Sequence, residues 1–268
     1  MICRAAGKQD KSGVPSDSLL AKTRFICYNA DGMKFLPPSQ RPYPPLVVGA
    51  VSDWDTWLNV SEPGADPECD IVELRVDALP PTITAEQLLE RRCVRPLLIT
   101  LRHASEGGCR PDWEETDRIE LARQLLPMAD LLDWEIARMA AAKSLLSEAR
   151  KSGITLIGSS HDFIDTPAAS TMLALEDKAR AQRMDIAKFA FRLNAAADMS
   201  IGCELLEAAR GPMALMGMGE LGPTSRLLFS QLGSCLIYGY LGSKPSAPGQ
   251  WKAGDFRRAL GTLVPSPA

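Results

Sequence analysis

From residue 46 onward, the chain alternates short apolar runs with longer segments of helical periodicity. The apolar runs are rich in β-branched residues and nearly continuous, so we predict that they are buried strands. Their ranges are Leu46–Val51, Ile71–Val76, Pro96–Leu101, Leu131–Ile136, Thr155–Ser159, Ile186–Phe191, Met213–Met218 and Cys235–Tyr240. The clearest helical segments are Thr84–Cys93, Trp113–Met128, Ala137–Lys151, Ala168–Arg183, Ala195–Ala209, Thr224–Leu232 and Phe256–Leu263.

Apolar strands that alternate with helices predict a parallel sheet covered by helices. Eight such units in about 220 residues match a closed (β/α)8 barrel, the TIM barrel of the α/β class. An open, doubly wound sheet is the structural alternative. No G-x-G-x-x-G motif follows the first strand and no G-x-x-x-x-G-K-[ST] occurs, so nucleotide binding lacks its usual loop. In a barrel we expect the chemistry at the carboxyl ends of the strands.

The first 45 residues have a different composition. Residues 1–22 are rich in Ser, Gly, Lys and Asp, and we predict a loose leader there. Residues 24–36 form a predicted β-hairpin, because short apolar stretches flank the turn sequence Asn29-Ala-Asp-Gly32. Several prolines then make a stiff connection. We therefore expect residues 23–268 to form a single barrel domain that includes the hairpin.

Composition limits the partners that we expect. The net charge is −3, so there is no basic surface for nucleic acid or an anionic membrane. The seven cysteines are scattered without C-x-x-C spacing, which argues against a disulfide framework or zinc knuckle and favours a reducing compartment. No secretory signal or membrane span is evident. We expect a cytoplasmic protein that binds a small molecule.

One lysine stands inside a predicted strand, in the sequence Asp185-Ile-Ala-Lys188-Phe-Ala-Phe191. Ile186, Phe189 and Phe191 belong in a core, so the position of Lys188 needs an explanation. Burial penalises a charged ammonium and lowers the pKa of lysine, which favours the neutral amine that attacks carbonyl carbons. The structural alternative is a side chain that reaches solvent at the strand end or pairs with Asp185.

Charged side chains also mark the second and third strands. Alternation places Glu73, Arg75 and Asp77 on one face of the second strand. Because a lone buried charge is costly, these residues either pair with one another or bind a polyhydroxylated substrate. After the third strand, Arg102 points inward by parity. Glu106 follows in a loop whose glycines let the backbone approach a ligand.

The chain contains only two histidines. His161 ends the fifth predicted strand, so an imidazole acid–base role at this face falls to it, although a lone histidine is often structural. By parity His103 points away from the face of Arg102, and we expect it at the surface or in packing. Without companion cysteines or clustered carboxylates, two histidines do not predict a metal site.

The last two units supply candidate anion and lid contacts. Arg226 lies in the predicted first turn of a helix that Thr224 or Ser225 could cap, where acidic residues are preferred. Bidentate capture of a substrate carboxylate explains an arginine there. Ser246 and Gln250 belong to a loop rich in proline and glycine, where they suit either a lid or a plain surface turn.

Together these motifs resemble type I 3-dehydroquinate dehydratase, the Schiff-base enzyme of the shikimate pathway. The matching segments run in family order over about residues 46–252. They are Glu73-Leu-Arg75-Val-Asp77, Arg102 with Glu106-Gly-Gly108, Ser160-His161-Asp-Phe163, Ala187-Lys188, Met216-Gly-Met218-Gly with Ser225-Arg226, and Ser246-Ala-Pro-Gly-Gln250. One motif is weak evidence, whereas six in order are specific. Two residues depart from the family pattern. Ser160 stands where the family commonly has Tyr or His, and Tyr238 stands where Phe is common.

The resemblance implies dehydration of 3-dehydroquinate to 3-dehydroshikimate, without metal or organic cofactor, by a homodimer. It implies that Lys188 forms the imine, that His161 is the general acid and base, and that Glu106 orients His161. Arg226 would hold the carboxylate. The other implied substrate contacts are Glu73, Arg75 and Arg102 on the ring hydroxyls, Met216, Met218 and Tyr238 as walls, and Ser246 and Gln250 closing over the ring.

Two other functions deserve comparison. A class I aldolase also uses a barrel lysine, but its usual phosphorylated substrates bind to a glycine-rich phosphate-binding loop. Arg226, Ser246 and Gln250 instead suit a substrate with a carboxylate and hydroxyls. A non-catalytic metabolite sensor on the same fold would be expected to lack Lys188 or His161, or to carry a DNA-binding domain. The chain keeps both residues, and we expect no DNA-binding domain in it.

Overall fold

All eight predicted strands are present and lie in one parallel sheet. The computed structural model describes residues 45–243, 245 and 250–263. The predicted leader, the hairpin at 24–36 and Ser246 lie outside these residues. The strands are β1 (Leu46–Val51), β2 (Ile71–Arg75), β3 (Leu97–Thr100), β4 (Leu131–Glu135), β5 (Thr155–Asp162), β6 (Ile186–Arg192), β7 (Met213–Met218) and β8 (Leu236–Tyr240).

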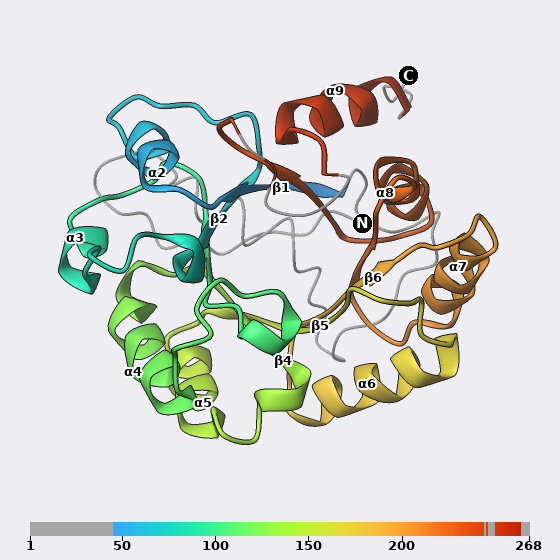
Figure 1. Ribbon diagram of the computed structural model, residues 1–268, viewed down its shortest axis with the longest axis horizontal. Coiled ribbons are helices and arrows are strands. Elements are labelled where there is room, and N and C mark those ends of the chain that lie inside the picture. The colour runs from blue at the N-terminus through green and yellow to red at the C-terminus, as the bar shows by residue number, and fades with distance from the viewer. Residues whose placement is uncertain (1–44, 244, 246–249, 264–268) are drawn as a thin grey trace, which may run out of the picture.

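The sheet closes on itself almost completely. Each strand from β1 to β6 pairs with the next along the chain, and β1 also pairs with β8. The helices surround this ring of strands (Figure 1). The prediction of a (β/α)8 barrel is therefore confirmed, and the open doubly wound sheet was the wrong alternative.

Eight α-helices are described on the outside of the barrel. They are α2 (Trp54–Val60), α3 (Ala85–Leu89), α4 (Glu115–Leu125), α5 (Lys143–Lys151), α6 (Ala169–Ala181), α7 (Asp198–Ala208), α8 (Gly222–Gln231) and α9 (Ala253–Leu263). The capping box at the start of α3 is formed, since Thr84 Oγ1 accepts from Gln87 N and Gln87 Oε1 accepts from Thr84 N. No helix in the described part of the chain is both long and apolar enough to cross a membrane.

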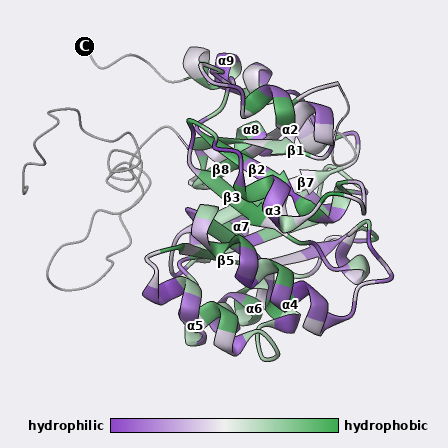
Figure 2. Ribbon diagram, turned by 90° about the vertical axis from the view of Figure 1, so that its left-hand side faces the viewer, coloured by the Kyte–Doolittle hydropathy of each residue, from purple (hydrophilic) through white to green (hydrophobic). Residues whose placement is uncertain are grey.

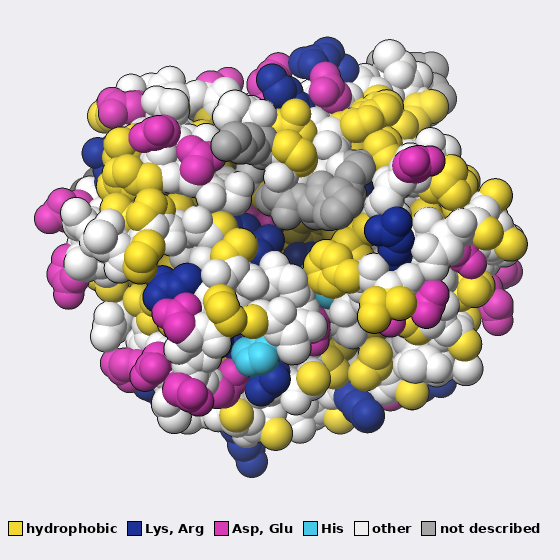
Figure 3. All heavy atoms as spheres, in the orientation of Figure 1, with side chains coloured by type: hydrophobic (Ala, Val, Ile, Leu, Met, Phe, Trp, Pro, Cys, Tyr) yellow, Lys and Arg dark blue, Asp and Glu magenta, His cyan; other side chains and the backbone are white. Residues whose placement is uncertain are grey.

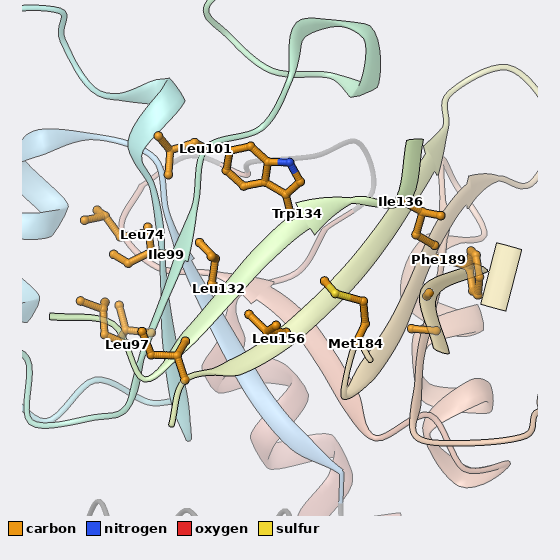
Figure 4. Packing of buried hydrophobic residues seen from close by; sticks show 14 of the residues in the cluster. Leu74, Leu97, Ile99, Leu101, Leu132, Trp134, Ile136, Leu156, Met184 and Phe189 are labelled. Atoms are coloured by element: carbon orange, nitrogen blue, oxygen red, sulfur yellow. The ribbon is translucent and has the colours of Figure 1, made fainter. Parts of the chain in front are cut away.

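The barrel separates two apolar cores. Outward-facing strand residues form the larger core together with apolar residues of the helices. Figure 4 shows Leu132, Leu156 and Phe189 among the residues of this cluster. In Figure 2 the apolar colour follows the strands while the helices carry most of the polar colour. A smaller cluster of inward-facing residues fills the barrel itself, and we call it the interior cluster. It contains Val48, Ile71, Leu98, Leu131, Ile157, Ile186, Ala190, Ala214, Met216, Met218, Leu236 and Tyr238.

Two of the differences between the predicted and observed strand ends affect the candidate site. β2 stops at Arg75, and Val76–Ala78 form the 3-10 turn η2, so Asp77 does not share a strand face with Glu73. β5 continues to Asp162, three residues beyond the predicted end, so His161 is held by strand pairing with Ala190 of β6. A histidine on a paired strand is held more rigidly than one in a loop.

The one gap in the barrel lies between β7 and β8, which share no strand ladder in the described residues. Cys235 N donates to Met213 O at the start of the two strands. Higher up, the Ser234 hydroxyl accepts from Leu215 N and donates to Leu236 O, and so replaces a rung of the ladder. We call this gap the β7–β8 seam.

Gly239 sets how closely α9 packs on β8. A Cβ atom at Gly239 would lie 2.6 Å from the Cα and N atoms of Ala253, the first residue of α9. We expect Gly239→Ala to lower the free energy of unfolding by about 1–3 kcal/mol, measured by urea denaturation, because the helix must move outward. Gly261→Ala is the matched control, since nothing lies within 4 Å of its Cβ position in α9. It should raise stability by about 0.5–1 kcal/mol. Equal stabilities for both variants would contradict this packing.

Candidate active site

The amine of Lys188 lies inside the barrel between two carboxylates. The residue is 4 % exposed. Its Nζ donates to Asp133 Oδ2 at 2.9 Å and lies 3.7 Å from Glu73 Oε1. It also stands 4.2 Å from the centroid of the Tyr238 ring, a cation–π contact. The lysine therefore neither reaches solvent nor pairs with Asp185, whose carboxylate accepts from Leu156 N instead.

Asp133 joins the lysine to a neighbouring arginine. Arg102 Nη2 lies 2.8 Å from Asp133 Oδ1, and the Ser159 hydroxyl donates to the same oxygen. Burial alone would raise the pKa of Asp133, but the charges of Arg102 and Lys188 hold it well below its usual range. Asp133 is therefore an anion shared by two buried cations.

The network continues outward through Glu135. This carboxylate accepts from Arg102 Nη1 at 3.0 Å and from Arg118 Nη2 at 2.6 Å. Arg118 is 1 % exposed, donates to Leu101 O and lies 4.6 Å from the centroid of the Trp134 ring. The charges thus alternate from the barrel axis to the helix layer, which leaves each buried charge with a partner.

Sequence reasoning missed Asp133, Glu135 and Arg118. The first two could have been found, because two carboxylates alternate in an otherwise apolar strand, Leu131-Leu-Asp133-Trp-Glu135. Alternation places both inside the barrel. Arg118 carries no comparable signal, since an arginine within a polar helix such as α4 is ordinary.

The charged residues of the second strand divide into two roles. Glu73 is 4 % exposed, accepts from the Thr100 hydroxyl at 2.9 Å and faces Lys188. Arg75 instead makes a bidentate pair with Asp77, whose carboxylate also accepts from the backbone N–H groups of Arg102 and Cys109. Asp77 therefore belongs to a structural ion pair, the alternative left open by the sequence.

His161 and Glu106 form a hydrogen-bonded pair. His161 Nδ1 and the His161 backbone N both lie 2.9 Å from Glu106 Oε2. Burial, with the positive charges of Arg102 and Lys188, lowers the pKa of His161 well below its usual value, so the imidazole is neutral. Burial raises the pKa of Glu106 to about 7. The other histidine, His103, accepts from Ser105 N at the start of the 3-10 turn η3 (Ala104–Glu106) and stays outside this pair.

Arg226 fills the upper part of the β7–β8 seam. Its guanidinium donates to Gly217 O of β7 at 3.3 Å and to Tyr238 O of β8 at 2.5 Å. The side chain is 2 % exposed and pairs with no carboxylate among the described residues. Burial lowers its pKa to about 10. This arginine is thus a buried cation held by two carbonyl groups, with its charge left uncompensated.

The local structure around Arg226 differs from the prediction. α8 begins at Gly222 with Leu221 as its N-cap, so Arg226 lies in the second turn rather than the first. Ser225 is not a cap either, because its hydroxyl accepts from Gly217 N and donates to Gly222 O. Contact with both strands of the seam, rather than the helix terminus, determines where the guanidinium lies.

Three further predicted residues line the same interior. Met216 and Met218 on β7 and Tyr238 on β8 are each less than 5 % exposed and belong to the interior cluster. Gln250 is buried just before α9. A hollow opens near the middle of the face seen in Figure 3, and dark blue Lys and Arg atoms lie within it. In the described part of the chain, no three His, Cys, Asp or Glu residues are grouped to hold a metal ion.

The chain matches one known protein family over most of its length. The sequence model of type I 3-dehydroquinase matches residues 56–266. The chain belongs to this family. The family match spans all the strands from β2 to β8 and every predicted site residue.

Two relatives of the same family are similar in sequence to this chain over most of their length. The chain is 31% identical over 224 residues to a 3-dehydroquinate dehydratase of Methanocella arvoryzae, covering 82% of this chain and 98% of that protein. It is 33% identical over 214 residues to one from Enterococcus faecalis, covering 73% and 83%. A solved structure of 3-dehydroquinate dehydratase from Enterococcus faecalis superposes with a TM-score of 0.70 at 27% identity, covering 87% of this chain and 100% of that one.

The charge network makes a stability prediction. We expect Asp133→Asn to lower the free energy of unfolding by about 3 kcal/mol, because Lys188 and Arg102 both lose a buried counter-charge. Asp177→Asn is the matched control, since Asp177 pairs with Arg210 at the surface and its loss should cost less than ~1 kcal/mol. Urea denaturation measures both. A variant at Asp133 as stable as the control would show that the network does not hold the barrel interior together.

Proposed function

We propose that this chain dehydrates 3-dehydroquinate to 3-dehydroshikimate through an imine on Lys188. One observation carries the proposal beyond family membership. Tyr238 contacts both a buried amine and an uncompensated guanidinium, since its ring lies on Lys188 Nζ and its carbonyl accepts from Arg226. A nucleophile and a free cationic site at such close quarters suit a substrate that carries a ketone and a carboxylate.

The imine solves the chemical problem of the reaction. Removing a proton beside a ketone gives a poorly stabilised enolate. Condensation of the ketone with Lys188 gives an iminium, whose positive charge acidifies the neighbouring C–H and accepts the electron pair as an enamine. Loss of the β-hydroxyl then leaves a conjugated product, and water hydrolyses the imine to release the lysine.

The two carboxylates beside Lys188 suit this sequence of charges. The nitrogen carries a positive charge as the ammonium and again as the iminium. Asp133 and Glu73 lie 2.9 and 3.7 Å from it and stabilise both forms. Sequence reasoning considered only the burial of this lysine, whereas the structure also places two carboxylates beside its nitrogen.

His161 is the proposed proton carrier. A neutral imidazole that donates Nδ1–H to the Glu106 carboxylate leaves the Nε2 lone pair free to take a proton. His161 could take the proton from the lysine, then from the substrate carbon, and afterwards protonate the departing hydroxyl. Glu106 fixes the tautomer that makes this possible.

The other residues are proposed to bind the substrate. Arg226 would pair with the carboxylate, which supplies the counter-charge that the guanidinium lacks. The remaining proposed contacts are Glu73, Arg75 and Arg102 for the ring hydroxyls, Met216, Met218 and Tyr238 for the ring faces, and Ser246 with Gln250 as the closing lid. Arg75 would make its contact while it keeps its bidentate pair with Asp77.

Loss of the lysine tests the proposal directly. We expect Lys188→Ala to reduce dehydration at least about 10³-fold, because no other group replaces the electron sink. Ultraviolet absorbance of the conjugated enone product measures the rate. Lys178→Ala, an exposed lysine of α6, is the matched control and should keep full activity. No enone from the unaltered protein would refute the dehydratase assignment, and normal turnover by Lys188→Ala would refute the imine.

Glu106 should give the activity its pH dependence. Below its pKa of about 7, a protonated Glu106 would donate to Nδ1 and leave Nε2 protonated, so His161 could not act as a base. We therefore expect kcat to rise with pH through about 7. Glu106→Gln should lower kcat about 10–100-fold and abolish this rise, since an amide orients the imidazole but does not titrate. An unchanged rise in the variant would assign it to another group.

A further inference from the structure

The hydroxyl of Tyr238 is a buried polar group without a protein partner. The residue is 3 % exposed, and no described residue donates to or accepts from its Oη. Five buried side-chain polar atoms lack a partner in the described residues, and only this one belongs to the interior cluster. Because a buried hydroxyl without a partner destabilises the folded protein, its presence beside the proposed catalytic groups calls for a functional explanation.

The position of the ring brings this hydroxyl close to the reacting atoms. Lys188 Nζ lies 4.2 Å from the centroid of the Tyr238 ring, and Arg226 donates a hydrogen bond to the backbone carbonyl of Tyr238. The phenol oxygen is less than a ring's length from that centroid. When Nζ bonds to the carbonyl carbon of the substrate, the oxygen on that carbon therefore comes within hydrogen-bonding reach of the Tyr238 hydroxyl.

The environment keeps the hydroxyl protonated. Burial, with the negative charges of Glu73 and Asp133, raises the pKa of Tyr238 well above its usual value. The phenol is therefore neither a general base nor an acid that gives up its proton. It remains a hydrogen-bond donor in a water-poor interior, where donors aimed at developing negative charge are most effective.

We propose that Tyr238 is a catalytic residue, whose hydroxyl donates a hydrogen bond to the substrate's ketone oxygen while Lys188 adds to the carbonyl carbon. This inference rests on the imine chemistry proposed above. The ketone oxygen is preferred over a ring hydroxyl because it shares its carbon with the attacking nitrogen and gains negative charge during the attack.

The step balances without any outside reagent. His161 takes one proton from the Lys188 ammonium, and the nitrogen lone pair forms the C–N bond while the carbonyl π pair moves to oxygen. Tyr238 stabilises this oxygen and keeps its own proton. His161 returns its proton to the oxygen and a second proton follows from the nitrogen. The C–O bond then breaks, the remaining nitrogen lone pair forms the iminium, and water leaves with both hydrogens from the ammonium.

Tyr238→Phe tests the hydroxyl alone, because it keeps the ring beneath Lys188. Borohydride quenching after rapid mixing with saturating 3-dehydroquinate gives the rate of adduct formation. We expect this rate to fall tenfold or more, as for loss of a donor to a developing oxyanion. Urea denaturation should show no loss of stability, since the substitution removes an unpartnered hydroxyl. Tyr238→Leu, which also removes the ring, should slow the adduct further and lower stability.

The outcomes separate this inference from the proposed function. If the unaltered protein forms no adduct, the imine itself is wrong. If the unaltered protein forms the adduct and Tyr238→Phe forms it within twofold of the same saturated rate, the hydroxyl is only a packing feature and the inference is overturned. A change confined to the half-saturating substrate concentration would also overturn it, because that would indicate ground-state binding alone.

Discussion

The ion pair between Lys188 and Asp133, 2.9 Å long and inside the barrel, is the interaction on which the rest of the site depends. A buried ammonium is tolerated only with a partner, and a buried carboxylate equally so. Asp133 meets this need for two cations at once, and Glu135 does the same for Arg102 and Arg118. The result is one chain of alternating charges from the barrel axis to α4, so that the position of the amine is fixed by strands β3, β4 and β6 together.

The β7–β8 seam supplies the contrasting feature. Every other buried cation in this network has a carboxylate, whereas Arg226 has only the carbonyl oxygens of Gly217 and Tyr238 among the described residues. Opening the ladder at one place both creates room for the guanidinium and exposes the carbonyls that hold it. The missing counter-charge would arrive with an anionic substrate, so binding would complete the electrostatics of the barrel.

The sequence allowed the fold and most of the site to be predicted, for identifiable reasons. The strands follow from nearly continuous apolar runs, and the closed barrel follows from the count of eight strand–helix units. The inward positions of Arg102 and Glu73 follow from the alternation of side chains along a strand, which is a local signal. Asp77 was misplaced because parity fails where β2 gives way to a 3-10 turn. The ion pair of Arg118 and the hydrogen bonds of Arg226 join segments that are distant in the sequence, so no local pattern predicts them. Those contacts decide which charges are compensated, and that is where the chemistry is proposed to lie.

The central claim is that a single nitrogen, held between Asp133 and Glu73, carries the substrate covalently during turnover. Reduction with borohydride during turnover, followed by mass spectrometry of the digested protein, tests it most directly. The account predicts one added substrate-derived mass, located on Lys188, which appears only when 3-dehydroquinate is present. An unmodified Lys188 under conditions where product forms, or an adduct on another lysine, would contradict the account.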